Sequence, residues 1–353
     1  MKIRQVELQN FLLFHELNST FSPNINVISG ENSTGKTALI KVLYSCVKSW
    51  DMLQKAKGDV TKSRFEEILV SKLQGVYHPS KDSIGRLVYR RPGVNKSDVA
   101  VQFDMSGIIQ FNFTSKHEKH IELDKMDLPK SDVSAVYIPP KEIISATENF
   151  GSLYTDYHIG FEETYYDLAR LLERPLKRGA NTAEQNAVLK SFGKILDGDI
   201  VQKSNAFYLK VKGAGEFEMG LVSEGYRKLA TVMYLISSGS LSKNAVLFWD
   251  EPETNMNPKM IKPIVDAIIE LAKLGVQVFV TTHDYFVQQC FDMAVAYPAK
   301  DSAPLDINFI ALYKEANGIE IESAKRLIEL GHNSVMEEFD ALYDREQVLI
   351  NGY

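Results

Sequence analysis

The sequence predicts an α/β fold with a mainly parallel sheet, and segments in the N-terminal and C-terminal thirds of the chain support this prediction. Short apolar runs at 245–249 and 276–281 are typical of buried strands, and the amphipathic segment 258–273 between them is typical of a helix. A strand at 25–29 followed by a helix from 36 towards 50 repeats this order near the N-terminus. Strands that alternate with helices of this size form parallel sheets with crossover helices.

The N-terminal third also predicts an antiparallel β subdomain. Its apolar residues alternate with polar ones, and turn residues separate the runs. The polar and somewhat basic stretch 51–98 favours a solvated outer face, and a DNA-binding surface is the alternative. We expect strands at 3–10, 87–89, 99–103, 108–113 and 136–138.

The middle third changes to a helical pattern. Apolar residues from Phe161 to Leu172 recur on one helical face, and Thr182 with Gln185 can form a capping box at the start of a second helix. From Phe207 the strand pattern returns. These changes divide the chain into an N-terminal lobe (1–144), a helical insertion (145–205) and a C-terminal lobe (206–353).

Composition and charge exclude several classes of protein. The chain has 353 residues, of which 44% are hydrophobic and 24% charged, which is a globular balance. A net charge of -6 argues against a protein that coats nucleic acid indiscriminately. The two cysteines, Cys46 and Cys290, cannot build a disulfide framework or a metal-ligand cluster. The sequence contains neither an apolar run long enough to span a membrane nor the apolar core of a signal peptide. We therefore expect a cytoplasmic protein with no membrane partner.

A complete phosphate-binding loop, G-x-x-x-x-G-K-T, lies between the strand at 25–29 and the following helix. In such a loop the backbone N–H groups wrap the phosphates, Lys36 reaches the β and γ phosphates, and Thr37 holds Mg²⁺. The sequence therefore predicts a site for ATP and Mg²⁺. Its nucleotide-binding residues are Gly30, Glu31, Asn32, Ser33, Thr34, Gly35, Lys36, Thr37 and Ala38.

Two further strands end in residues suited to nucleotide chemistry. Asp250 and Glu251 follow the strand at 245–249, where Asp250 is placed to hold Mg²⁺ and Glu251 to act as a general base. His283 follows the next parallel strand, so it reaches the same sheet edge and is a candidate γ-phosphate sensor. The alternatives are a structural acidic pair and a packing histidine. The predicted catalytic residues are thus Lys36, Glu251 and His283, and the predicted metal ligands are Thr37 and Asp250.

The order of these motifs resembles the ABC ATPase superfamily, specifically its soluble SMC/RecF-like branch with the overcoming-lysogenization-defect and phage-defence ATPases. In that family a signature segment precedes the acidic strand and contacts the ATP held by the opposite subunit. Residues 222–230 match its position, so the resemblance implies that Ser223 and Gly225 bind the γ phosphate in trans. Glu224 replaces a small residue of the family's pattern, and a helix cap is the alternative interpretation. The resemblance implies an ABC-type ATPase head that forms a homodimer through composite ATP sites.

Three more segments resemble the same family. Asn10 and Phe11 with Phe14 resemble its opening N-F-x-x-F motif, and 251–258 resembles the segment that crosses the dimer interface after the catalytic glutamate. The stretch 138–142 resembles one common in the defence-type members. The family's glutamine-bearing loop stays unassigned, and its candidates are Gln74, Gln102 and Gln110.

The insertion narrows the functions that the motifs allow. It is too short for the long coiled-coil arm of repair clamps, and the signature departs from the Ser-Gly-Gly-Gln of transporters. We expect no appended nuclease domain in the residues after His283. The sequence thus predicts an ATP-hydrolysing ATPase that dimerises on ATP and regulates a separate effector protein, such as a nuclease or toxin, in anti-phage defence or DNA metabolism. The alternatives are an SMC/RecF-type repair factor that binds DNA directly, and a scaffold that binds ATP without turnover.

Overall fold

The computed structural model describes residues 1–157, 159–177, 179, 181–203, 206–298, 304–316 and 318–351. Helices and strands alternate between residues 224 and 281 in the order that the sequence predicts, whereas runs of strands and of helices occupy most of the chain before this part. The strands are β1 (Ile3–Phe11), β2 (Phe14–Thr20), β3 (Ile25–Gly30), β4 (Lys96–Phe103), β5 (Ile108–Thr114), β6 (Glu122–Asp127), β7 (Ser134–Ile138), β8 (Gly198–Lys203), β9 (Ala206–Val211), β10 (Gly215–Glu218), β11 (Ala245–Asp250), β12 (Gln277–Thr281), β13 (Ile307–Glu315) and β14 (Gly318–Ala324).

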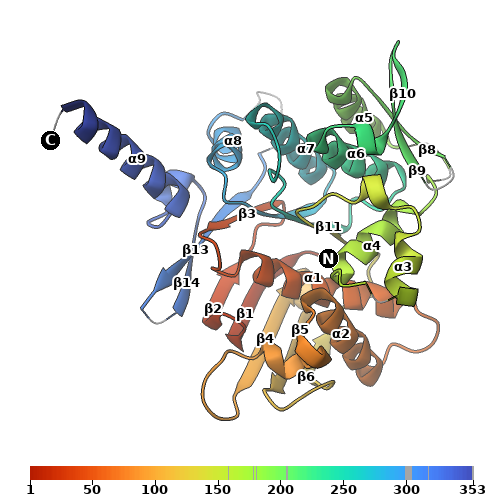
Figure 1. Ribbon diagram of the computed structural model, residues 1–353. Coiled ribbons are helices and arrows are strands. Elements are labelled where there is room, and N and C mark those ends of the chain that lie inside the picture. Colours follow the sequence, from red (N-terminus) through yellow and green to blue (C-terminus); the bar gives the residue numbers. More distant parts are fainter. Residues whose placement is uncertain are drawn as a thin grey trace.

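The helices cover the sheets and fill the space between them (Figure 1). Among the described residues, no helix is long and apolar enough to cross a membrane. The helices are α1 (Lys36–Lys55), α2 (Lys62–Tyr77), α3 (Phe150–Tyr157), α4 (Glu163–Leu172), α5 (Ala183–Leu196), α6 (Glu224–Ser237), α7 (Ile261–Lys273), α8 (Tyr285–Ala296) and α9 (Ser334–Asn351).

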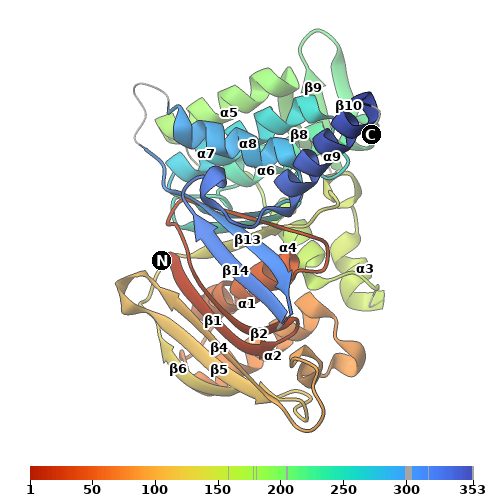
Figure 2. The ribbon, with the colours of Figure 1, turned by 90° about the vertical axis from the view of Figure 1, so that its left-hand side faces the viewer.

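The predicted mainly parallel sheet is confirmed. Its strand order is β14-β13-β3-β12-β11-β7, and every neighbouring pair is parallel except β13 with the edge strand β14. A second sheet, β2-β1-β4-β5-β6, is antiparallel throughout and confirms the predicted N-terminal subdomain. A small antiparallel sheet, β10-β9-β8, lies beside α5 and α6 (Figure 2).

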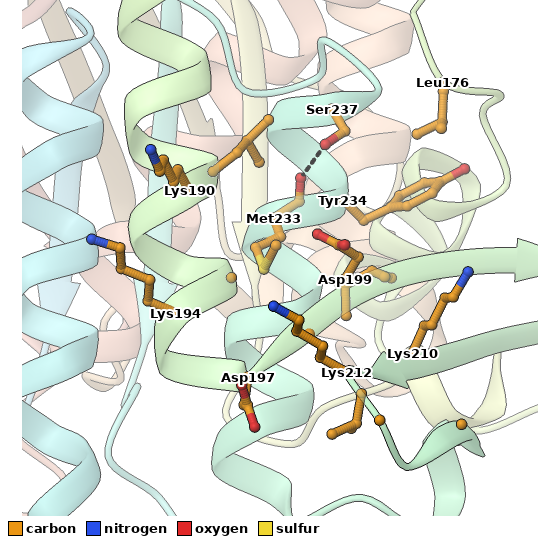
Figure 3. Close-up of a pocket in the computed structure, with 17 residues that line it drawn as sticks. Leu176, Lys190, Lys194, Asp197, Asp199, Lys210, Lys212, Met233, Tyr234 and Ser237 are labelled. Carbon is orange, nitrogen blue, oxygen red and sulfur yellow. Dashed lines mark hydrogen bonds between the residues drawn. The ribbon is translucent and has the colours of Figure 1, made fainter.

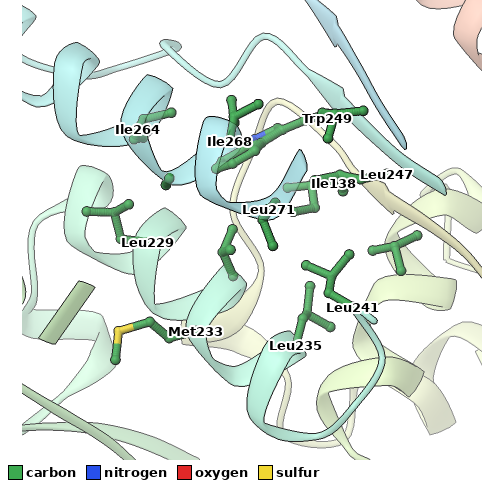
Figure 4. Close-up of a cluster of buried hydrophobic side chains, with 14 of the residues drawn as sticks. Ile138, Leu229, Met233, Leu235, Leu241, Leu247, Trp249, Ile264, Ile268 and Leu271 are labelled. Atoms are coloured by element: carbon green, nitrogen blue, oxygen red, sulfur yellow. The ribbon is translucent and has the colours of Figure 1, made fainter. Parts of the chain in front are cut away.

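Strand β11 separates two hydrophobic cores because its side chains alternate between the two faces of the sheet. Val246 and Phe248 point into a core that also contains α1 and the inner face of the antiparallel sheet. Leu247 and Trp249 point into the other core, formed with α6 and α7 (Figure 4). Both cores therefore hold the strand that carries the acidic pair.

The stretch 145–205 contains α3, α4 and α5, and also β8, which pairs with β9 across the boundary at 205. The predicted capping box of α5 is confirmed: the Thr182 hydroxyl accepts a hydrogen bond from the Gln185 N–H, and the Gln185 side chain accepts one from the Thr182 N–H. The two boundaries between the three predicted domains remain predictions.

One prediction in the N-terminal third is wrong, and one helix there was not predicted. The expected strand at 87–89 is the end of a 3₁₀ turn, and only Val88 pairs, as an isolated bridge with Phe11. The polar stretch 51–98 exposes most of its charged residues, as expected of a solvated face, but it also contains α2, which was not predicted. The helical signal was present in the sequence as Phe65, Leu69, Leu73 and Val76, which are spaced three and four residues apart and are all buried.

A buried network of charges joins α4 to α1 and α2. Lys72, which is 2% exposed, lies 2.6 Å from Glu163 and 2.9 Å from Asp167. Lys48 lies 3.5 Å from Asp167, and the Tyr44 hydroxyl donates to the same carboxylate. The two lysines and this hydroxyl hold the pKa of Asp167 below its usual range, although its burial acts in the opposite direction.

Replacing Lys72 with Met should lower the free energy of unfolding by about 3 kcal/mol, because two buried carboxylates lose their main partner. Urea denaturation followed by circular dichroism measures this loss. The matched control is Lys55→Met, which removes a lysine with a half-exposed side chain from its pair with Asp51 and should cost less than about 1 kcal/mol. Equal losses in the two variants would contradict a stabilising role for the network.

Candidate functional site

The backbone of the phosphate-binding loop has a conformation that only glycine adopts easily at two positions. Gly30 ends β3 with a φ of +145°, and a Cβ there would lie 2.2 Å from the carbonyl oxygen of Leu312. Gly35 has a φ of +94°, and a Cβ there would lie 2.5 Å from the ring of Phe14. Phe14, part of the predicted N-F-x-x-F motif, thus packs directly under the loop. Ser33 is also left-handed, with a φ of 65°.

Lys36 lies folded over this loop. Its Nζ donates to the carbonyl oxygens of Gly30 at 2.7 Å and Glu31 at 2.9 Å. Burial lowers the pKa of Lys36, while the carboxylates of Glu251 and Asp250 act in the opposite direction. A partly desolvated ammonium group is therefore held where the loop would receive phosphate oxygens.

Asp250 is the centre of a set of hydroxyl groups at the end of β11. Its carboxylate accepts hydrogen bonds from Thr37 at 3.1 Å, from Tyr137 at 2.9 Å and from Thr281. Burial raises the pKa of Asp250, although these three hydrogen bonds favour the charged form. A hydroxyl and a carboxylate at this distance are oxygen ligands that fit Mg²⁺, which takes few protein ligands beside phosphate and water.

Glu251 and His283 meet at the same edge of the sheet, as the parallel strand order predicts. His283 Nδ1 lies 3.4 Å from Glu251 Oε1. This hydrogen bond lowers the pKa of Glu251 and raises the pKa of His283. Glu251 has a φ of 46°, and its N–H donates to Thr281, which fixes the turn after β11.

Glu253 is a buried carboxylate that the sequence did not single out. One of its oxygens accepts hydrogen bonds from the Thr282 hydroxyl at 2.6 Å and from the His283 N–H at 3.1 Å. Within the described residues its other oxygen, Oε2, has no hydrogen-bond partner. Burial raises the pKa of Glu253. Glu253 therefore positions the backbone that carries His283.

The signature helix α6 is tied to the segment that follows Glu251. Lys228, which is 1% exposed, donates from Nζ to the carbonyl oxygens of Pro252 at 3.1 Å and Thr254 at 2.8 Å. Burial lowers the pKa of Lys228 to about 8. Arg227, its neighbour, lies 2.9 Å from Glu142 after β7. Sequence reasoning missed both contacts, since they depend on how α6 packs.

A cavity of about 320 Å³ adjoins the loop and reaches Glu251. The described residues that line it do not include Ser223 or Gly225, so this chain does not bring its signature to its own phosphate-binding loop. Ser223 is exposed and its side chain makes no capping hydrogen bond. The lining residues are Leu12, Leu13, Asn32, Ser33, Gly35, Lys36, Thr37, Ala38, Lys41, Tyr77 and Glu251.

The three candidates for the glutamine-bearing loop lie away from this cavity. The Gln74 side chain donates to the carbonyl oxygen of Asp82, and Gln102 donates to Glu7 at 3.3 Å. Gln110 lies on β5 of the antiparallel sheet. None of the three is among the described residues that line the cavity, so the loop stays unassigned.

Comparison with known families agrees with this geometry. A family model described as "AAA domain, putative AbiEii toxin, Type IV TA system" matches residues 68–287, which is more than half of the chain. The chain belongs to this AAA-domain family. Its P-loop precedes the matched segment, while the acidic pair and His283 lie within it.

Curated relatives of this AAA-domain chain match it over shorter segments. The DNA replication and repair protein RecF of Lactococcus lactis subsp. cremoris is 39% identical, and RecF of Halalkalibacterium halodurans is 46% identical, each over 44 residues. These matches cover 12% of this chain and 12% of each RecF chain. The arginine transport ATP-binding protein ArtP of Haemophilus influenzae is 24% identical over 186 residues, which cover 50% of this chain and 69% of ArtP.

Two solved structures share the fold. An Smc head bound to the C-winged helix domain of ScpA has a TM-score of 0.55 at 14% identity and covers 92% of this chain and 98% of its own. An Smc head domain with an extended coiled coil, bound to the C-terminal domain of ScpA derived from Pyrococcus furiosus, has a TM-score of 0.51 at 12% identity and covers 97% and 99%. The predicted ABC-type, SMC/RecF-like head is thus confirmed at the level of the fold.

The pair of Glu251 and His283 should be visible in a pH titration. Because the imidazolium donates to Glu251, the pKa of His283 should lie above its ordinary value of 6.5, and Glu251→Gln should bring it back down. This pair then stabilises the fold between about pH 4.5 and pH 6.5. Its contribution is lost as the pH rises through the raised pKa of His283, and also as the pH falls through the lowered pKa of Glu251. Nuclear magnetic resonance of the histidine ring protons measures the titration. If His283 has the same pKa in Glu251→Gln as in the unaltered chain, the two groups are not coupled. Glu270→Gln, which removes a different carboxylate, is the matched control.

Proposed function

We propose that this chain binds and hydrolyses ATP with Mg²⁺. The observation that carries the proposal is one cavity that joins Lys36, Thr37 and Glu251, with Asp250 hydrogen-bonded to Thr37. These residues make up the positioning and charge-stabilising set of a P-loop ATPase. The family and the fold support nucleotide binding, and the residues of the cavity supply the groups that ATP hydrolysis needs.

Each residue has a distinct part in this mechanism. The loop backbone and the Lys36 ammonium group bind and orient the phosphates, and Thr37 with Asp250 would hold Mg²⁺. Mg²⁺, when bound, neutralises charge that develops on the phosphate oxygens. Glu251 is kept ionised by its hydrogen bond with His283, so it can accept a proton from the attacking water.

Two copies would complete each nucleotide site. The signature residues Ser223 and Gly225 are absent from the cavity of their own chain, and the side chain of Ser223 is exposed. A two-fold contact that places this signature against the loop of a second copy makes both sites at once. We propose that ATP drives this closure and that the homodimer regulates a separate effector protein in anti-phage defence or DNA metabolism.

The effector proposal draws on the family description, which names a putative toxin of a toxin–antitoxin system, and on the Smc heads that were solved with ScpA. The alternative is a DNA-binding repair factor, and it has less support. The RecF matches of 39% identity or more span 44 residues, and a RecF match that spans 148 residues is 20% identical. Lys72 of the basic stretch is buried in an ion network instead of facing solvent.

Replacing Glu251 with Gln should lower ATP turnover by at least about 100-fold while ATP is still bound, because the general base is lost and the shape is kept. Lys36→Ala should weaken binding itself. Phosphate release and calorimetric ATP binding measure the two effects, and Glu270→Gln is the control for removal of a half-buried carboxylate outside the cavity. Tight ATP binding by the unaltered chain without any turnover, alone or with its effector and DNA, would contradict the proposal.

Closure should be visible as an ATP-dependent contact between the signature of one copy and the loop of another, and as a change in mass at protein concentrations where the chain without nucleotide is monomeric. With Mg-ATP, Glu251→Gln should accumulate as a closed dimer, and Ser223→Arg should block closure while leaving binding at the loop nearly intact. Light scattering at low protein concentration measures the mass, and Ser71→Arg on the exposed face of α2 is the matched control. A cysteine at position 33 of one copy should also crosslink to a cysteine at position 223 of another (Ser33→Cys and Ser223→Cys) when Mg-ATP is present. The proposal fails if Mg-ATP changes neither the mass of Glu251→Gln nor this crosslinking.

A further inference from the structure

A second cavity, of about 900 Å³, lies between α5, the strands β8 and β9, and α6 (Figure 3). It is larger than the nucleotide cavity and shares no lining residue with it. Its floor is apolar and includes Leu189, Ile200, Val211, Met233 and Tyr234. We call this cavity the lysine cleft, because lysines dominate its rim.

The rim of the lysine cleft carries an excess of positive charge. Lys190 and Lys194 come from α5, one helical turn apart, and the other two lysines come from β9 and the residue after it. In the described part of the chain none of the four forms an ion pair with a carboxylate. The four lysines outnumber the two carboxylates of the lining, and the set is Lys190, Lys194, Lys210 and Lys212 against Asp197 and Asp199.

Helix α9 has the complementary chemistry and leaves most of its length exposed. It extends away from the body of the molecule (Figure 1), and none of its residues is buried. Its carboxylates outnumber its one cation, Arg345, and Glu346 lies on its apolar face. At helical spacing, that face exposes Phe339 (47%), Leu342 (56%), Tyr343 (61%), Leu349 (79%) and Ile350 (69%).

The base of α9 is fixed, so the direction of the helix is set by the fold. The Asn333 side chain donates to Gln288 of α8 at 2.8 Å, and its oxygen accepts from the N–H of Val335 at 3.3 Å. The ring of Phe339 lies 4.3 Å from that of Tyr285. Beyond this contact, α9 is an acidic amphipathic helix presented to solvent.

We infer that α9 of one copy of this chain occupies the lysine cleft of a second copy. Within one chain the helix and the cleft lie on opposite sides of the molecule, so α9 cannot reach its own cleft (Figure 1). Packing two α9 helices against each other would bring their carboxylates together, whereas the cleft offers opposite charge around an apolar floor. A helix of 18 residues is about 27 Å long, enough to lay several turns along the cleft.

A reciprocal exchange of this kind gives a two-fold dimer in which each copy donates one helix and receives one. The contact uses no residue of the nucleotide site, so it goes beyond the proposed ATP-driven closure and forms without nucleotide. It would keep two heads in one assembly while their ATP sites open and close.

Charge reversal tests this contact in the full chain without nucleotide, by sedimentation velocity over a range of protein concentrations. Lys190→Glu with Lys194→Glu should weaken the dimer by at least about tenfold, and so should Asp340→Lys with Glu346→Lys on α9. A chain that carries all four changes should recover the dimer, because the charges are again complementary. Raised salt should weaken the dimer of the unaltered chain.

The matched control is Lys116→Glu with Lys119→Glu, which makes the same change of charge on exposed residues between β5 and β6 and should leave the dimer unchanged. A chain that is monomeric at all concentrations without nucleotide overturns the inference. The inference is also overturned if the α9 changes alter the dimer but the cleft changes leave it intact. In that case α9 would pair with another surface. Lys36→Ala should leave this dimer unaffected, which separates its outcome from that of the ATP-driven closure.

Discussion

The burial of α1 between the two sheets is the constraint on which the rest of this molecule depends. The helix lies inside the core shared by the parallel and antiparallel sheets, and most of its length is buried, including lysines at three positions. A helix held on both sides cannot shift along its axis without breaking both contacts. Its first residues, Lys36 and Thr37, are therefore fixed relative to Asp250 at the end of β11.

Burying charged residues of α1 requires partners, and the helical insertion supplies them. Lys41 pairs with Glu162 at 2.6 Å, and Lys48 pairs with Asp167 of α4. Tyr44 donates to Asp167, and its ring lies 5.3 Å from that of Tyr137, whose hydroxyl donates to Asp250. The insertion is thus joined through contacting side chains to the carboxylate placed for Mg²⁺. Lys41 also lines the cavity beside the phosphate-binding loop, so this cavity is connected to Glu162 at the start of α4 through one side chain.

The opposite end of the site is organised by α6. Lys228 donates to the carbonyl groups of Pro252 and Thr254, so α6 is joined to the segment that follows Glu251. One chain therefore brings the loop, Asp250 and Glu251 together, while Ser223 at the start of α6 is exposed. The lysine cleft lies behind the same helix, since Met233 and Tyr234 of α6 form part of its floor. A helix docked there would touch the element that carries the signature.

The sequence by itself determined the class of fold and predicted which residues meet at the candidate site. The phosphate-binding loop, the acidic pair and His283 follow strands in a spacing that predicts one edge of a parallel sheet, because the ends of parallel strands meet there. Local patterns of this kind also predicted the capping box at Thr182. They failed for α2, where frequent charges hid the apolar spacing, and at 87–89, where a short apolar run forms a turn.

Only the tertiary structure decided which side chains serve these motifs from a distance. Tyr137 and Thr281 bind Asp250 because β7 and β12 flank β11, and no local pattern records which strands become neighbours. Glu253 and Lys228 are buried charges, and their sequence context does not distinguish them from solvated ones. The separation of Ser223 from the chain's own loop, and of α9 from the lysine cleft, likewise depends on packing between segments far apart in the chain. Local sequence patterns predict the chemistry available to each residue, whereas packing between distant segments decides which other residues it contacts.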